Sequence, residues 1–135
     1  MARAASSGSK PSESFRREAA QSARRAIDAG HYAQGERRVD ELLKHEVSAQ
    51  HYALRAEARL GLRRSRAALR DAGRALALNP GNPDALRLIG RAHHQAGDGA
   101  RALYYYRLFM VRTESDAGRA PQRAAVQAAI AKLGS

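Results

Sequence analysis

The sequence contains no cysteine and no tryptophan, and only 5% of its 135 residues are aromatic. The absence of cysteine excludes a disulfide framework, a Cys-ligated zinc ion and a cysteine nucleophile. With so few aromatic side chains, a core has to be built from Ala and Leu, which favours closely packed helices. The length suits one domain.

Long apolar runs are also absent, and none approaches the length that spans a bilayer. The N-terminal stretch "MARAASSGSKPSES" has two basic residues but no apolar segment after them, so it is not a secretory signal. It is polar and aperiodic, and we expect residues 1–14 to form a mobile tail. We therefore expect the protein to be cytoplasmic.

Positive charge is in excess, since 21 Arg and 3 Lys face 13 acidic residues, for a formal net charge of +11. Such a balance favours an acidic partner, whether nucleic acid, an acidic peptide or an anionic membrane. A chain rich in both Ala and Arg is also typical of a GC-rich genome, whose arginines then lie on solvated helix faces. Composition alone leaves both interpretations open.

One pattern of small and apolar residues recurs along the chain. In the segment 82–113 the pattern comprises Leu86, Ile89, Gly90, His93, Gly97, Asp98, Ala102 and Tyr106. This spacing resembles a tetratricopeptide repeat, a helix-turn-helix unit of about 34 residues. Asn82 and Pro83 are typical of a helix start, and Gly97 followed by Asp98 is typical of a helix end and a new cap.

A second copy lies 34 residues earlier, with Tyr52, Arg55, Ala56, Arg59, Ala68, Ala72, Ala75 and Pro80. It departs from the pattern at Arg63, where the family has the turn glycine, while Gly61 stands two positions earlier. The resemblance implies that Arg55 and Asp71 pair between the two helices. A weaker first copy has Gly30, His31 and Tyr32 at its turn.

The resemblance implies an all-α, helix-turn-helix repeat solenoid. We expect three helix pairs over 15–113, with boundaries at about 15–47, 48–81 and 82–113. A small residue at Gly90 or Ala56 lets paired helices approach closely. Val126, Ile130 and Leu133, at i, i+4 and i+7, predict a last helix over 119–133 that caps the third pair.

In proteins that this chain resembles, the first helices of the repeats line a concave groove for a peptide or a partner's helix. Carried over by register, that groove would contain Arg17, Arg24, Gln50, Glu57, Arg87, Arg91 and His94. Arg87, Arg91 and His94 lie at i, i+4 and i+7 and form a basic stripe, which suits an acidic ligand. The Lys and Asn residues that clamp chaperone C-termini in part of the family are absent, since Ala20, Arg24, Leu54, Asp84 and Leu88 stand there.

A second set of arginines gathers around the turn and second helix of the middle repeat. It comprises Arg63, Arg64, Arg66, Arg70 and Arg74. A solvated convex face is one interpretation, and an anion or nucleic-acid patch is the other.

The histidine pair and the tyrosine triplet also invite a functional interpretation. His93 and His94 point about 100° apart on a helix and have no Cys or carboxylate at ligand spacing, so we predict no metal site. Tyr106 is a core position by register, and we expect Tyr104 and Tyr105 to pack against neighbouring helices. Because the helix over 103–111 is nearly all apolar, we expect it to be covered on more than one side, by the last helix or by another chain.

These observations favour a non-catalytic adaptor, or a small chaperone or assembly factor, that binds an acidic protein segment in a concave groove. The size is also that of type III secretion chaperones. No phosphate-binding glycine loop, nucleophile elbow or paired carboxylates appear, so we predict neither enzymatic activity nor a cofactor. The alternatives are a nucleic-acid-associated protein that uses the arginines of 63–74, and a structural protein that self-associates through 103–111.

Overall fold

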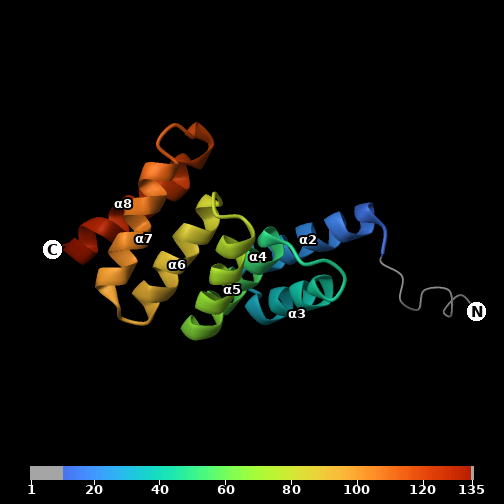
Figure 1. Cartoon of the computed structure of the whole chain (residues 1–135). Coiled ribbons are helices and arrows are strands. Elements are labelled where there is room, and N and C mark those ends of the chain that lie inside the picture. Colours follow the sequence, from blue (N-terminus) through green and yellow to red (C-terminus); the bar gives the residue numbers. More distant parts are fainter. Residues whose placement is uncertain (1–10, 135) are drawn as a thin grey trace, which may run out of the picture.

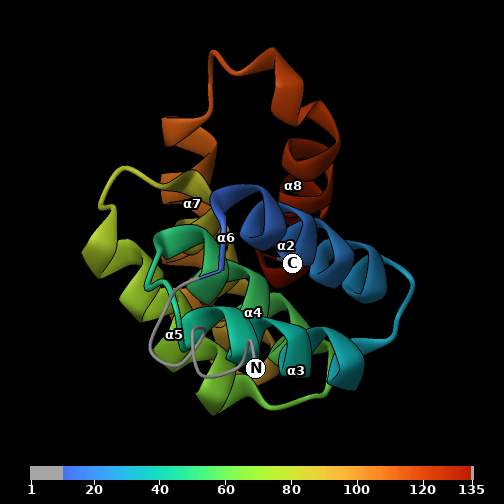
Figure 2. The same cartoon turned by 90° about the vertical axis from the view of Figure 1, so that its right-hand side faces the viewer.

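The computed structural model of the protein describes residues 11–134, and all regular structure in that range is helical. The elements are α2 (Glu13–Asp28), α3 (Tyr32–Leu43), α4 (Ala49–Gly61), α5 (Ser65–Leu78), α6 (Pro83–Gln95), α7 (Gly99–Arg112), the 3₁₀ turn η1 (Ala117–Arg119) and α8 (Ala120–Gly134). The helices pair as α2–α3, α4–α5 and α6–α7. Figure 1 shows these pairs in a row, with α8 beside α7 at the C-terminal end. Figure 2, which looks along the row from its α2–α3 end, shows that successive helices are rotated relative to one another. The predicted all-α repeat solenoid is confirmed.

The first helix begins earlier than the sequence predicted. Ser12 caps α2, because its Oγ accepts a hydrogen bond of 3.1 Å from the backbone N–H of Phe15. Residues 13 and 14 therefore belong to α2 and not to the expected tail 1–14, whose residues 1–10 lie outside the described part of the chain.

The turns inside the three pairs share one backbone conformation. Gly30, Arg63 and Gly97 have φ values of 85°, 64° and 89°. In each turn the next residue donates its N–H to a carbonyl five positions back, as Arg64 does to Arg59 at 2.8 Å and Asp98 to His93 at 2.8 Å. This is the hydrogen bonding of a left-handed helix end, for which glycine is favoured. The middle turn thus keeps the same backbone geometry without its glycine, and Arg63 adopts a strained left-handed conformation in it.

Small residues allow the paired helices to approach closely, as predicted. Ala56 and Ala68 are fully buried between α4 and α5. A Cβ at Gly90 would lie only 2.6 Å from Cδ1 of Tyr106, so the tyrosine ring packs directly on the backbone of α6. Gly61 allows a similarly close contact between α4 and α3, because a Cβ at residue 61 would overlap the ring of Tyr32.

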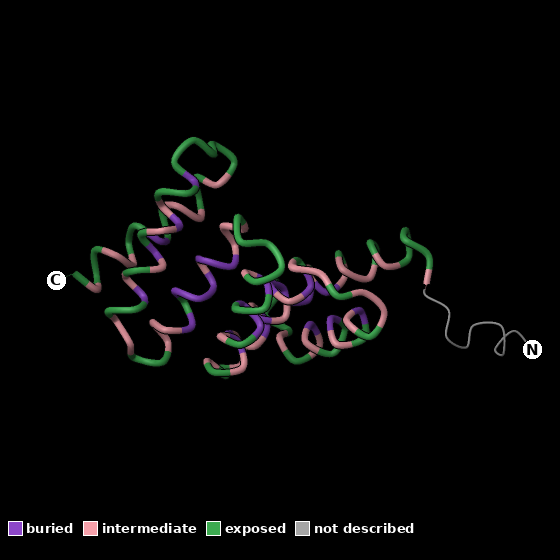
Figure 3. Tube along the Cα trace, viewed as in Figure 1, coloured by how far each residue is buried: buried purple, intermediate pink, exposed green. Residues whose placement is uncertain are grey.

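The buried residues line the facing sides of the helices and are mainly Ala and Leu (Figure 3). The core continues into the C-terminal helix, where Val126 packs with Tyr106 and Phe109. Ile130 and Leu133 extend the same contact, so the predicted stripe of α8 does cover the third pair.

A buried carboxylate joins the two helices of the middle pair. Asp71 is fully buried and accepts hydrogen bonds of 2.9 Å from Nε and Nη2 of Arg55, and a third of 2.9 Å from Arg59. The hydrogen bonds that Arg55 donates to Asp71 raise the pKa of Arg55. The predicted pairing of Arg55 with Asp71 is confirmed.

The tyrosine triplet divides differently from the prediction. Tyr106 is buried, and Tyr105 is half-buried and stacks on His93 with ring centroids 5.9 Å apart. Tyr104 is 60% exposed, so the expectation that it packs against neighbouring helices is wrong. The physical reason is that α8 covers only one side of α7 and leaves the side of Tyr104 in solvent.

Among residues 11–134, no helix is both long and apolar enough to cross a membrane.

Candidate functional site

Three hollows follow one another on the side of the molecule formed by α2, α4, α6 and α8. The first hollow, of about 390 Å³, lies between α2 and α4, and the central hollow, of about 450 Å³, extends from α2 and α4 to the start of α6. The third, which we call the terminal slot, has about 400 Å³ and lies between α6 and α8. The first helix of every pair thus contributes to this series, which we call the concave face.

The first hollow contains two of the predicted groove residues. Arg17 and Gln50 both line it, and Gln50 also lines the central hollow. Arg17 lies near Glu13 on the same helix, with 3.7 Å between Nη2 and Oε2, and its side chain is largely exposed. Gln50 is exposed as well, so it separates the two hollows without filling either.

An alternating series of charges crosses the central part of the concave face. In spatial order it consists of Arg24, Glu57, Arg87, Asp84 and Arg119. Three guanidinium groups therefore face two carboxylates, and the residues come from α2, α4, α6 and η1. We call this series the ion chain.

The ends of the ion chain are the tighter contacts. Nη1 and Nη2 of Arg24 donate to Oε1 and Oε2 of Glu57 at 2.9 and 2.6 Å, and these hydrogen bonds raise the pKa of Arg24. At the other end, Nη1 of Arg119 donates to Oδ1 of Asp84 at 2.8 Å, which raises the pKa of Arg119. Much of the positive charge predicted for the groove is thus balanced inside the protein.

Arg87 lies in the middle of the ion chain and is unusual for an arginine. Its side chain is only 13% exposed, and its Nη2 lies 3.8 Å from Glu57 and 3.7 Å from Asp84. Burial lowers its pKa. Its Nε is buried and has no hydrogen-bond acceptor among the described residues.

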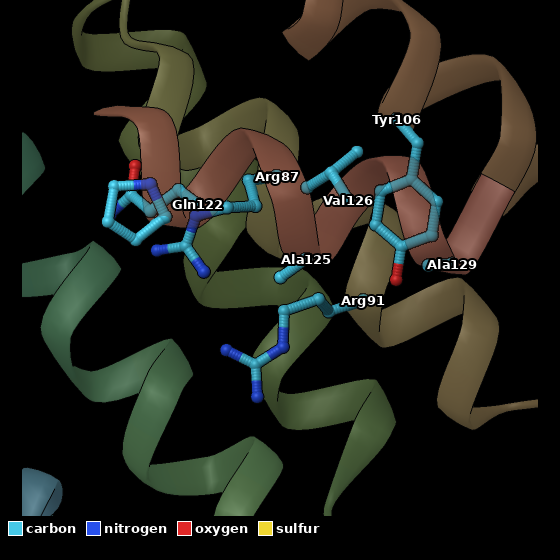
Figure 4. A pocket seen from close by; sticks show the side chains of 8 residues that line it. Arg87, Arg91, Tyr106, Gln122, Ala125, Val126 and Ala129 are labelled. Carbon is cyan, nitrogen blue, oxygen red and sulfur yellow. The ribbon is translucent and has the colours of Figure 1, made fainter. Parts of the chain in front are cut away.

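The terminal slot is shown in Figure 4 and is lined mainly by apolar atoms. Its lining residues are Arg87, Arg91, Tyr106, Pro121, Gln122, Ala125, Val126 and Ala129. The guanidinium groups of Arg87 and Arg91 lie on one side of the slot in this view, away from Tyr106 and Ala129. Arg91 is exposed and forms no ion pair with any residue in the described range 11–134.

His94, the last residue of the predicted basic stripe, is turned toward the protein. Its Nδ1 lies 3.2 Å from the hydroxyl of Tyr106, and the two rings meet edge to face. The structure therefore brings Arg87 and Arg91 together in the terminal slot, while His94 supports the tyrosine that forms one wall.

Sequence reasoning missed the contribution of the C-terminal segment. Arg119 lines the central hollow, and α8 supplies Gln122, Ala125, Val126 and Ala129 to the terminal slot. These four α8 positions follow the spacing i, i+3, i+4 and i+7, which a search for a second helical face would have found. The sequence does not say which neighbour that face meets.

The five arginines of the middle repeat all lie in solvent, at the turn before α5 and along it. Arg64 pairs with Glu36 at 3.2 Å, and Arg74 lies 3.7 Å from Asp71. No ion pair joins Arg63, Arg66 or Arg70 to another described residue. They line none of the three hollows, so this arginine cluster is separate from the concave face.

Between residues 11 and 134 there is no group of three or more His, Asp or Glu side chains arranged to hold an ion.

The protein resembles known proteins in fold but not in sequence. No protein family model and no curated protein sequence matches the chain. PcrH from Pseudomonas aeruginosa superimposes with a TM-score of 0.83 at 14% identity, over 93% of this chain and 96% of PcrH. The Yersinia enterocolitica type III secretion chaperone SycD, solved with a peptide of the translocator YopD, gives 0.80 at 11% identity over 91% and 95%.

A plant domain has the same architecture. The tetratricopeptide repeat domain of Arabidopsis OM64 gives a TM-score of 0.76 at 20% identity, over 89% of this chain and 94% of that domain. The protein therefore has a tetratricopeptide-like fold, with three helix pairs and a further C-terminal helix, as the sequence predicted.

Proposed function

We propose that the protein is a non-catalytic adaptor or small chaperone that binds an extended segment of a partner protein along its concave face. The observation that carries this proposal is the series of three hollows on the first helices of all three pairs. A continuous series suits a peptide, because successive side chains of an extended segment can occupy successive hollows.

Two structural neighbours support the same function. PcrH has been solved with the chaperone-binding region of PopB, and SycD with a peptide of YopD. Both align with nearly the full length of this chain, so the concave face described above has a counterpart in each. The ion chain adds a physical reason, since it holds the first helices of the three pairs in fixed positions before any ligand arrives.

The test is capture of partner proteins from the native lysate after nuclease treatment, with matched tryptophan variants. Gln50→Trp places a large ring between the first and central hollows, whereas Gln21→Trp adds the same ring at another exposed position of the neighbouring helix. We expect wild type and Gln21→Trp to retain a partner that Gln50→Trp loses. Equal recovery by Gln50→Trp would contradict binding on the concave face.

A second candidate is nucleic-acid binding through the arginine cluster. Its support is that all five arginines are exposed and that Arg63, Arg66 and Arg70 have no acidic partner among the described residues. Phosphate binding predicts an affinity that falls log-linearly with salt. The double variant Arg66→Glu, Arg70→Glu should then abolish retention of a short duplex DNA on a filter. An affinity that does not change with salt concentration would exclude this candidate.

A third candidate is self-association through α7. Tyr104 and Val111, seven positions apart on that helix, are 60% and 72% exposed. Tyr104→Lys should convert a dimer to a monomer in sedimentation analysis, and a monomeric wild type at high concentration would exclude this candidate. The cytoplasmic location expected from the sequence stays a prediction.

A further inference from the structure

The terminal slot combines an apolar interior with positive charge at one side. Ala125 and Ala129, at i and i+4 of α8, present only methyl groups to it, which is why a space remains between α6 and α8. Tyr106 and the buried Val126 complete the apolar surface. Its volume of about 400 Å³ accommodates one large apolar side chain and part of the adjoining backbone.

Two positive groups border this space and differ from the rest of the concave face. Arg24 and Arg119 are held by Glu57 and Asp84 at hydrogen-bond distance. Arg91 has no ion pair among the described residues, and Nε of Arg87 is buried without an acceptor. The exposed guanidinium of Arg91, with that of Arg87 on the same side of the slot, favours a carboxylate ligand.

We propose that the terminal slot selects the partner: it binds a large apolar side chain of the peptide, while Arg91 and Arg87 bind the carboxylate of an acidic residue close to it. This inference rests on the proposed function and specifies the ligand at one end of the concave face. A further open hollow beside Pro121 and Gln122 reaches Asp84 and Arg119, which also line the central hollow, so the peptide runs from the central hollow into the slot.

The experiment selects peptides from a random twelve-residue display library on the full-length protein and measures the affinity of the best ones by fluorescence anisotropy. Ala125→Leu fills the slot, and Ala128→Leu makes the same change at an exposed position of α8 outside it. Arg91→Glu reverses the slot charge, and Arg66→Glu reverses an exposed arginine of the cluster. Thermal unfolding of all four variants verifies the fold.

We expect selected peptides to pair a large apolar residue with Asp or Glu within four positions. Ala125→Leu and Arg91→Glu should each weaken binding by about tenfold or more, and replacing the acid in the peptide by its amide should have a similar effect. Ala128→Leu and Arg66→Glu should stay within about twofold of wild type.

Three results would overturn the inference. If the selected peptides bind Gln50→Trp weakly but Ala125→Leu as tightly as wild type, the proposed function stands and the terminal slot does not bind the peptide. Self-association abolished by Ala125→Leu would assign the slot to a second copy of the chain. If wild type selects no peptide at all, the proposed function fails together with the inference.

Discussion

Arg24 of α2 and Glu57 of α4 form a two-point contact, with Nη1–Oε1 at 2.9 Å and Nη2–Oε2 at 2.6 Å. Oε2 of the same glutamate lies 3.8 Å from Nη2 of Arg87 on α6. One carboxylate thus connects the first helices of all three pairs, and it determines how much of the positive charge of the concave face is available to a ligand.

Glu57→Gln should lower the free energy of unfolding by about 1–3 kcal/mol, because it removes the carboxylate that Arg24 and Arg87 share and leaves each of them one acidic neighbour, Asp28 at 3.0 Å and Asp84 at 3.7 Å. Urea unfolding followed by circular dichroism measures this loss. Glu13→Gln is the matched control, since Glu13 is highly exposed and lies 3.7 Å from Arg17. Its effect should stay below about 1 kcal/mol. Equal effects of the two variants would show that the ion chain does not stabilise the fold.

Asp71→Asn should lower the free energy of unfolding further, by about 3–5 kcal/mol, because Asp71 is fully buried and accepts hydrogen bonds from Arg55 and Arg59. Asp40→Asn removes a more exposed carboxylate that contacts Arg55 at 2.8 Å and should cost much less. The same urea experiment compares them. An Asp71→Asn protein as stable as Asp40→Asn would contradict the role assigned to this carboxylate.

Gly90→Ala and Gly73→Ala should change stability in opposite directions, although both replace a helical glycine. A Cβ at residue 90 would lie 2.6 Å from the ring of Tyr106, so this variant should lose about 1–3 kcal/mol. A Cβ at residue 73 meets no atom within 4 Å, so that variant should gain about 0.5–1 kcal/mol from helix propensity. Thermal unfolding measures both, and a stabilised Gly90→Ala would disprove the close approach of α6 and α7.

Arg63→Gly should stabilise the protein by about 0.5–1 kcal/mol, because Arg63 has a φ of 64° that glycine adopts without strain. Arg63→Ala separates charge from backbone conformation, since it removes the charge but keeps the Cβ, and it should leave the stability nearly unchanged. If both variants were equally stable, the left-handed backbone at this turn would not be strained.

Local sequence signals are enough to specify the helices and turns of this protein. The turn at Gly97, the cap at Asn82 and the small residues at Ala56 and Gly90 are local signals, and they act through backbone conformation and steric size wherever the chain carries them. The pairing of Arg55 with Asp71 also followed from the repeat pattern, because its register places both residues at the same helix–helix contact.

The charges and the shape of the concave face depend on contacts between helices that are far apart in the sequence. Arg24 is balanced by Glu57 across 33 residues of the chain, and Arg119 by Asp84 across 35 residues. The same holds for the terminal slot, because the orientation of α8 relative to α6 follows from how Val126 packs on α7. Contacts between distant elements depend on packing of the whole chain, and no local pattern encodes them.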